Sequence, residues 1–229
     1  MIFDCLSKIL KKYSNLIYPS FCKSCEILIE QDSIFCTDCF SRIKPIVSSY
    51  LQITPTKTIK VFAVSDYKDP LKSLILEKSY SANILASKQL AQIIYKKTQI
   101  KNFRFDYLIP VPIHWIRFSK RGYNQAFEIS KELGRDLDIL VLDVIKRVKY
   151  TKFQSNFSFE QRQENVRDIF DLNNKSEKFY LTIKEKIIGK DLLLVDDLCT
   201  TGATLKNLAR FLLKFNPKSI TAIVACRVV

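Results

Sequence analysis

Residues Leu192–Leu205 read LLLVDDLCTTGATL, and this stretch is the strongest indication of the fold in the sequence. Its first four residues form a continuous apolar run, which is typical of a strand buried on both faces of a parallel sheet. We therefore expect a strand over 192–196, a loop, and a helix over 203–215. Strand-like and helical patterns alternate along the remaining chain. This alternation predicts an α/β fold with a mostly parallel sheet that helices cover on both faces.

Two adjacent acids, Asp196 and Asp197, follow the apolar run. Ligands of open α/β sheets bind beyond the carboxyl ends of the strands, and helix N-termini bind phosphate through free N–H groups. Paired carboxylates can also accept hydrogen bonds from vicinal hydroxyls, so the motif favours a phosphorylated sugar. Helix capping is the simpler interpretation, but it explains one acid or one threonine and not two acids followed by three threonines. The residues expected around the phosphate are Thr200, Thr201, Gly202, Ala203 and Thr204.

A second informative stretch, IPVPIHWIRFSKRGYNQA, covers Ile109–Ala126. We expect a short strand over 107–111 and a loop over 112–122 whose cations could clasp a pyrophosphate. Those cations are Arg117, Lys120 and Arg121. His114 is the single histidine of the chain. A lone histidine is more often structural than catalytic, and the sequence leaves its role open.

Four of the seven cysteines form two C-x2-C pairs, CKSC at 22–25 and CTDC at 36–39. Two such turns can supply the four thiolates that tetrahedral zinc prefers, whereas a redox motif would normally occur once. We therefore expect a structural zinc site formed by Cys22, Cys25, Cys36 and Cys39. The expected organisation is a helix over 4–18 and the cysteine knuckle in residues 1–48, a linker over 45–58, and the main domain in residues 58–229.

The net charge of +14 over 229 residues favours polyanionic partners. Basic residues are spread along the whole chain, so a solvated surface accounts for most of them. The exception is VIKRVKYTKFQSNFSF at 144–159, which has four aromatics, no acid and four cations: Lys146, Arg147, Lys149 and Lys152. This segment is predicted to contact single-stranded nucleic acid, although a mobile loop closing over an active site is an equally fair interpretation.

No apolar run approaches the roughly 18 residues that a membrane-spanning helix needs. Asp4, Lys8, Lys11 and Lys12 interrupt the apolar positions of the N-terminal segment, which therefore lacks the centre of a secretory signal. We expect a cytoplasmic protein. The sequence leaves open whether the first helix touches the inner face of the membrane.

The other expected elements come from periodicity. Strands are predicted over 61–67, 141–148 and 219–226, and helices over 70–79, 82–98, 123–135 and 161–168. The segment 171–190 is predicted to be polar and irregular.

The stretch Leu192–Leu205 resembles the phosphoribosyl-pyrophosphate loop of type I phosphoribosyltransferases, in which two acids precede T-T-G-A-T or a near variant. Together with the cysteine knuckle and a V-P-x-H-x2-R-x3-R-G-[FY]-N-Q motif at Val111–Gln125, it resembles the ComF family of competence-associated proteins. A further ComF segment is matched by Gln154, Phe159, Arg162 and Asn165. Asp69–Pro70 departs from the family pattern, which more often has glycine there, and 171–190 is longer than usual.

The resemblance implies a type I phosphoribosyltransferase-like parallel sheet with flanking helices, plus a small zinc-ribbon-like element at the N-terminus. It implies that Asp196 and Asp197 hold the ribose hydroxyls and that Thr200–Thr204 wraps the 5′-phosphate. It also implies handling of transforming single-stranded DNA during natural transformation, beside a helicase-like partner. An active phosphoribosyltransferase, with Mg²⁺ bridging the pyrophosphate and an unknown acceptor, is the alternative that the sequence leaves open.

Overall fold

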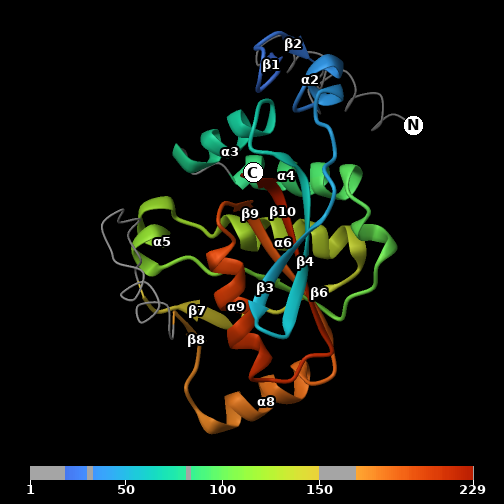
Figure 1. Cartoon of the computed structure of the whole chain (residues 1–229). Coiled ribbons are helices and arrows are strands. Elements are labelled where there is room, and N and C mark those ends of the chain that lie inside the picture. Colours follow the sequence, from blue (N-terminus) through green and yellow to red (C-terminus); the bar gives the residue numbers. More distant parts are fainter. Residues whose placement is uncertain (1–18, 30–32, 81–83, 150–168, 229) are drawn as a thin grey trace, which may run out of the picture.

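The structure is a computed structural model that describes residues 19–29, 33–80, 84–149 and 169–228 (Figure 1). The helices expected over 4–18 and 161–168 lie outside the described residues. Within the described residues, no helix is both long enough and apolar enough to cross a bilayer.

Six strands of the described chain form the main sheet, in the order β3-β4-β10-β9-β5-β6. The pairs β4–β10, β10–β9, β9–β5 and β5–β6 are parallel, and β3 pairs antiparallel with β4 at one edge. The predicted α/β class with a mostly parallel sheet is therefore confirmed. The strand bounds are β3 Ser49–Thr54, β4 Lys57–Asp66, β5 Tyr107–Pro110, β6 Leu140–Val141, β9 Asp191–Cys199 and β10 Ser219–Arg227.

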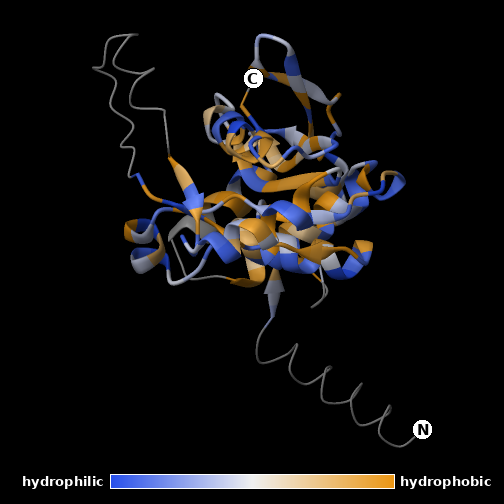
Figure 2. Ribbon diagram, turned by 90° about the horizontal axis from the view of Figure 1, so that it is seen from below, coloured by the Kyte–Doolittle hydropathy of each residue, from blue (hydrophilic) through white to orange (hydrophobic). Residues whose placement is uncertain are grey.

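Helices cover both faces of the sheet, which explains the continuous apolar run of β9. Leu192 and Leu194 pack in the core with α8 and α9, whereas Leu193 and Val195 pack with α3, α4 and α6. All four side chains are fully buried. Figure 2 shows the same arrangement as hydrophobic strands between helices of mixed colour. The helix bounds are α3 Leu71–Tyr80, α4 Ile84–Lys97, α6 Gln125–Leu137, α8 Glu177–Ile187 and α9 Ala203–Leu213.

Two segments that were expected to lack regular structure contain helices. The cationic stretch 112–122 holds α5 (Trp115–Arg121), and the stretch 171–190 holds α8. Helix α8 buries Ile183 and Ile187, and Phe179 packs against the same core at the same four-residue spacing. Ser176 caps its first turn by accepting a hydrogen bond from the Phe179 N–H at 3.3 Å. This spacing and cap were present in the sequence as a signal for a helix.

The predictions for one linker and one strand also change. The expected linker over 45–58 contains β3, which packs on α9: Arg210 Nε donates to the Ile53 carbonyl at 2.6 Å. The single strand expected over 141–148 is two short strands. The first is β6, and the second, β7 (Ile145–Arg147), leaves the main sheet to pair antiparallel with β8 (Phe170–Leu172).

The cysteine knuckle is formed by β1 (Ser20–Phe21), β2 (Leu28–Ile29) and α2 (Thr37–Ser41), and it lies beyond α3 and α4 in Figure 1. Its buried residues Phe35 and Ile43 belong to the same core cluster as α3 and α4. Lys97 Nζ of α4 lies 4.2 Å from the ring centroid of Phe40. The knuckle therefore packs on the main fold and shares a core with it.

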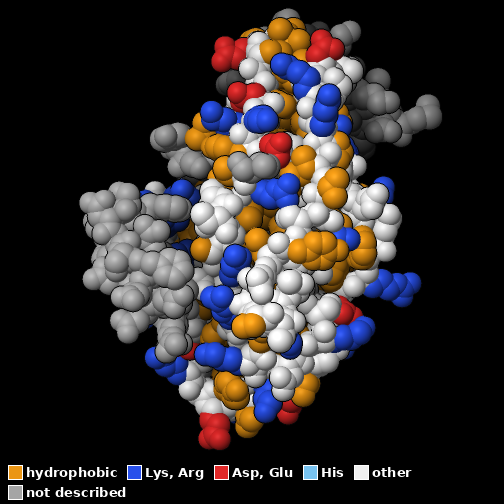
Figure 3. Space-filling model, in the orientation of Figure 1, with side chains coloured by type: hydrophobic (Ala, Val, Ile, Leu, Met, Phe, Trp, Pro, Cys, Tyr) orange, Lys and Arg blue, Asp and Glu red, His pale blue; other side chains and the backbone are white. Residues whose placement is uncertain are grey.

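Basic side chains are scattered over the face shown in Figure 3, from the knuckle to the opposite end of the molecule. They do not gather into one patch on that face. This distribution agrees with the interpretation that most of the net charge of +14 serves as a solvated surface.

Candidate functional site: the crevice between β5 and β9

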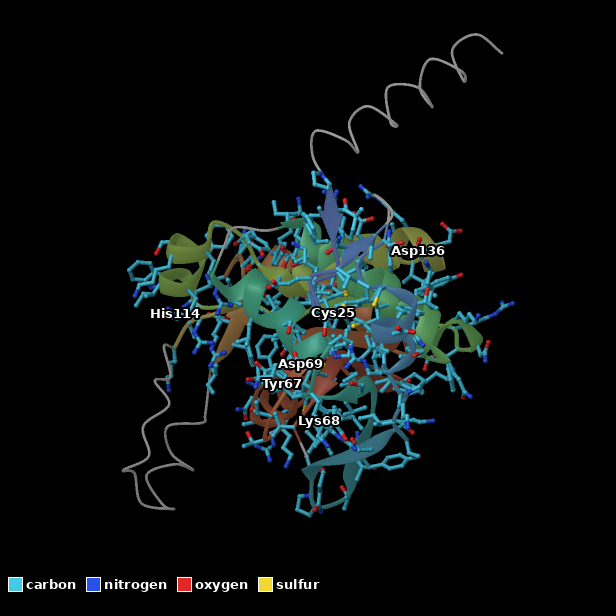
Figure 4. The ribbon with its side chains drawn as sticks, turned by 90° about the horizontal axis from the view of Figure 1, so that it is seen from above. Cys25, Tyr67, Lys68, Asp69, His114 and Asp136 are labelled. Atoms are coloured by element: carbon cyan, nitrogen blue, oxygen red, sulfur yellow. The ribbon has the colours of Figure 1, made fainter. Side chains whose placement is uncertain are left out.

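The chain changes direction between β5 and β9, and this position defines the candidate site. From β5 the chain runs through α6 to β6, toward one edge of the sheet, whereas from β9 it runs through α9 to β10, toward the other. In open α/β sheets, ligands bind beyond the carboxyl ends of the strands at such a switch point, and we call this position the crevice. Figure 4 views the molecule from this end, with His114 to one side and Tyr67, Lys68 and Asp69 nearer the centre.

The paired acids lie at the open end of β9. β5 pairs with β9 only as far as Pro110 and Val195, whereas β10 accompanies β9 to Cys199. Asp196 and Asp197 are therefore inside the last part of the strand rather than after it, but they lie past the end of β5. Asp196 Oδ1 accepts a hydrogen bond from the Asp197 N–H at 2.9 Å, and both residues are half-exposed. Both residues therefore lie at the crevice.

The loop after β9 leads into helix α9, as predicted. Thr200 and Thr201 are exposed, and Thr204 is half-buried. Gly202 is the N-cap residue and supplies no side-chain cap. The Ala203 N–H instead donates to Thr201 Oγ1 at 3.4 Å. The hydroxyls and the start of α9 thus lie together beside the acids.

Gly202 was expected beside the phosphate, and the packing of the loop gives a second reason for a glycine at this position. Its φ of 72° lies in the left-handed region that favours glycine. A Cβ at this position would also lie 2.7 Å from Leu51 Cδ1 of strand β3. The sequence could not identify Leu51 as the neighbour, because β3 and α9 are about 150 residues apart along the chain.

Helix α5 forms the other wall of the crevice, and His114 caps it. His114 Nδ1 accepts a hydrogen bond from the Ile116 N–H at 3.3 Å. Burial lowers the pKa of His114, the backbone of Val148 hydrogen-bonds to the ring and opposes the shift, and Arg147 and Arg117 lower the pKa further. The imidazole is therefore a neutral, buried group with partners on two sides. This geometry supports a structural role for His114.

The start of α6 holds the same wall in place. Asn124 Nδ2 donates to the Val111 carbonyl at 3.1 Å, and its Oδ1 accepts from the Ala126 N–H at 3.1 Å. One side chain therefore caps α6 and ties it to the loop after β5. Gly122, which was expected in a ligand loop, ends α5 as its C-cap with a φ of 79°.

Arg147 lies near the crevice, although its sequence context suggested a nucleic-acid contact. Burial is the main cause that lowers its pKa, the charge of Arg117 adds to the shift, and Asp196 opposes it. The three charged groups are thus close enough to influence one another. An isolated parallel bridge between His114 and Arg147 brings β7 to this position. Only the tertiary structure reveals this arrangement.

The remaining predicted residues are dispersed. Arg121 influences the pKa of the buried Tyr123, as does Asp197, so Arg121 lies on the crevice side of α5. Lys120 is exposed on α5. Lys146 Nζ donates to the Asn173 carbonyl at 3.2 Å, Lys149 is exposed, and Lys152 lies outside the described residues.

The four knuckle cysteines are brought together as predicted. Their sulfur atoms all lie within 4.8 Å of one another, and Cys25 Sγ is 3.7 Å from Cys36 Sγ. A tetrahedral zinc site with Zn–S bonds of about 2.3 Å has sulfurs about 3.8 Å apart, so the spacing fits such a site. The four thiols could therefore hold a metal such as zinc.

The electrostatics of the knuckle also favour a cation. Burial opposes ionisation of Cys22, but backbone N–H groups of Cys25, Cys36 and Ser24 outweigh it and lower its pKa to about 6. The Ile27 N–H favours ionisation of Cys25, but burial and the neighbouring sulfurs raise its pKa to about 12. These sulfurs cannot all ionise without added positive charge. Arg42, which sequence analysis missed, supplies part of it by donating from Nη2 to Cys39 Sγ at 2.6 Å.

The family model of the phosphoribosyl transferase domain matches residues 83–228, which include β5, α5, β9 and the loop into α9. Competence protein F of Haemophilus influenzae is 32% identical over 168 residues, which are 70% of this chain and 69% of that protein. This chain is a ComF-type member of the phosphoribosyl transferase family.

Two further relatives are also competence or DNA utilization proteins by name. The DNA utilization protein YhgH of Escherichia coli K12 is 24% identical over 90% of this chain and 89% of its own length. Competence protein ComFC of Bacillus subtilis is 33% identical over 47% of this chain and 38% of its own length. The names of these relatives refer to competence or to DNA utilization, and the relatives and the domain together support a role in competence.

Proposed function

We propose that this chain is a ComF-type protein of natural transformation that binds phosphoribosyl pyrophosphate with Mg²⁺ and assists the handling of single-stranded DNA in the cytoplasm. The observation that supports this proposal is the crevice between β5 and β9, where Asp196 and Asp197 lie beside the threonine loop. Arg147 lies close enough to Asp196 and Arg117 for both to influence its pKa. A helicase-like partner is a part of the proposal that rests on the family resemblance. Contact of the first helix with the inner face of the membrane stays an open part of it.

Each wall of the crevice suits one part of this ligand. The two carboxylates can accept hydrogen bonds from the ribose hydroxyls, and the hydroxyls and amides of Thr200–Thr204 can donate to the 5′-phosphate. Guanidinium groups bind phosphate oxygens through paired N–H donors, so Arg117, Arg121 and Arg147 suit the pyrophosphate, with Lys120 at the exposed rim. Mg²⁺, when bound, would neutralise part of the charge of the pyrophosphate.

The close approach of Arg117 and Arg147 supports an anionic ligand. Like charges repel, and burial of Arg147 adds a desolvation cost that Asp196 offsets only in part. A pyrophosphate between the two guanidiniums would relieve both costs. Arg147 is therefore proposed as a ligand-binding residue rather than as a nucleic-acid contact.

Calorimetry with phosphoribosyl pyrophosphate and Mg²⁺ tests the crevice. Replacing both acids, Asp196→Asn and Asp197→Asn, should weaken binding by about tenfold or more, because charge-assisted hydrogen bonds to the ribose are lost. Asp136→Asn is the matched control, since Asp136 is exposed on α6 and lies away from His114 in Figure 4. Equal affinities for the wild type and the double variant would remove the assignment.

A transferase activity is the second candidate, and membership of the phosphoribosyl transferase family favours it. The position of His114 argues against this side chain as the general base, because its imidazole already has partners at Ile116 and Val148. Incubation with labelled phosphoribosyl pyrophosphate and cell extract separates the candidates. Label transferred to an acceptor would establish an enzyme, and label recovered only as ligand or its hydrolysis product would support binding alone.

A further inference from the structure

Arg42 contacts the cysteine cluster directly, and the proposed function does not use this contact. Its Nη2 donates a hydrogen bond to Cys39 Sγ at 2.6 Å. A hydrogen bond from a guanidinium to a thiolate is charge-assisted, and such bonds are roughly twice as strong as neutral ones. Cys39 is 1% exposed, so water hardly reaches the sulfur that accepts this bond. The contact therefore differs from an ion pair between two solvated side chains.

The short helix α2 brings the cysteine and the arginine together. Cys36 precedes the helix, and its Sγ accepts a hydrogen bond from the Cys39 N–H at 3.4 Å. Arg42 is the C-cap residue, three positions after Cys39, so the two side chains lie on the same side of the helical turn. The Arg42 N–H donates to the Asp38 carbonyl at 3.2 Å, and the next residue, Ile43, is buried in the core shared with α3 and α4. The backbone of Arg42 is thus held by the helix on one side and by the core on the other.

The charge of Arg42 matters most when a divalent cation is bound. Four thiolates carry more negative charge than one divalent cation offsets, so a loaded cluster is anionic. The metal-free cluster can avoid this charge by keeping protons on its sulfurs, whereas the loaded cluster cannot. Cys22 and Cys39 are both 1% exposed, so water stabilises little of the charge on these two sulfurs. A guanidinium at Cys39 therefore stabilises the loaded cluster more than the metal-free one.

We propose that Arg42 is a positioning residue of the metal site, whose guanidinium holds the Cys39 thiolate toward the cation and strengthens binding of the metal. This role rests on the proposed zinc site and adds a residue beyond the four ligands. Removing a group that hydrogen-bonds to a metal ligand typically weakens metal binding by about 10- to 100-fold. Arg42 is itself exposed, so we expect an effect in the lower part of that range.

The zinc affinity of the full chain, measured by competition with a chelator of known affinity, tests this role. Arg42→Ala should bind zinc about tenfold more weakly than the wild type, because the positive charge and its N–H donors are lost. Arg42→Lys should lie between the two, since an ammonium keeps the charge but lacks the planar fork of donors. Lys44→Ala is the matched control. Lys44 is exposed two positions further along the chain, and its removal changes the net charge equally, so this variant should bind zinc as the wild type does.

Cobalt(II) in place of zinc gives a measurement that a purely structural role would not change. The energy of the sulfur-to-cobalt charge-transfer band depends on how strongly each thiolate donates to the metal. Without the N–H donor of Arg42, the Cys39 sulfur should donate more strongly. The band should therefore shift to lower energy in Arg42→Ala and stay unchanged in Lys44→Ala. Thermal melting by circular dichroism at saturating zinc checks that each variant is folded.

The outcomes separate the role of Arg42 from the metal site itself. If the wild type retains no zinc and gives no cobalt spectrum, both are overturned. If the wild type binds zinc and Arg42→Ala binds it equally tightly, the metal site stands and the role of Arg42 is overturned. Equal weakening in Arg42→Ala and Lys44→Ala would assign the effect to general surface charge and would also overturn the role.

Discussion

At the scale of single residues, backbone conformation and close packing act together at Gly202. Its left-handed φ and its contact with Leu51 place the loop after β9 against the edge strand β3. The same glycine begins α9 without a side-chain cap, next to the threonines that the proposed ligand would contact. The position of the candidate phosphate loop thus depends on one residue whose neighbour comes from the far edge of the sheet.

Gly202→Ala should lower the free energy of unfolding by about 1–2 kcal/mol, because alanine is disfavoured at positive φ and its Cβ would press on Leu51. Denaturant unfolding measures this change. Gly122→Ala is the control with a similar φ of 79° and no atom within 4 Å of the added Cβ, so it should cost about 1 kcal/mol from the backbone alone. A cost for Gly202→Ala no larger than that for Gly122→Ala would show that Leu51 yields freely.

At the scale of elements, α5 shows how a short cationic segment becomes a helix. Three of its seven residues are cations and its two exposed aromatics face water, so its sequence lacks the apolar stripe that indicates a helix. The residues at the two ends stabilise the helix. His114 caps the first turn, and Gly122 ends the last turn with a left-handed backbone conformation. The cap also carries a titratable group, which makes the element sensitive to pH.

The stability of the chain should fall as the pH drops below about 6.5, the ordinary pKa of histidine. The folded state lowers the pKa of His114, chiefly by burial, so the unfolded chain binds a proton first as the pH falls. The contribution is complete above pH 6.5 and is lost toward the lower folded pKa, with a slope of at most about 1.4 kcal/mol per pH unit. Cys22, whose pKa is lowered to about 6, also titrates in this range, so the effect of His114 is measured as a difference from a variant that lacks the histidine. Denaturant unfolding between about pH 5.5 and 7.5, about one unit either side of the histidine pKa, allows this comparison.

His114→Asn provides the comparison, since asparagine can cap a helix but does not titrate. This variant should show a flatter dependence of unfolding free energy on pH in the same range. An equal dependence in both proteins would assign the effect to another group.

At the scale of the whole molecule, the knuckle and the sheet form one packed structure. Cys22, Cys39, Phe35 and Ile43 belong to the core cluster that includes α3, α4 and one face of the sheet. The chain was expected to divide into residues 1–48 and 58–229, and β3, which joins the sheet, occupies the intended linker. Disruption of the knuckle should therefore lower the stability of the whole molecule.

Cys36→Ser should reduce the zinc content of the purified protein and lower the melting temperature of the whole chain in one transition, because the metal thiolates support a shared core. Elemental analysis and calorimetry measure the two effects. Cys5→Ser is the control, since Cys5 is not part of a C-x2-C pair. An unchanged main transition with a separate early one would show that the knuckle unfolds independently.

Features that depend on local pattern could be predicted from the amino-acid sequence. The apolar run at 192–195 predicted the central strand, because a strand buried on both faces needs apolar residues at every position. The order of acids, threonines and glycine identified the candidate phosphate loop, and the two C-x2-C pairs identified the cysteine cluster that the structure brings within 4.8 Å.

Features that depend on contacts between distant segments became visible in the folded structure alone. Arg147 faces Asp196 because β7 leaves the main sheet and docks beside His114, and no local pattern encodes that departure. The packing of Leu51 near Gly202 and the shared core of knuckle, helices and sheet likewise arise from contacts between segments that are distant along the chain. Local propensity sets which segments become strands or helices, whereas the burial of their faces against distant partners sets which side chains meet at the crevice.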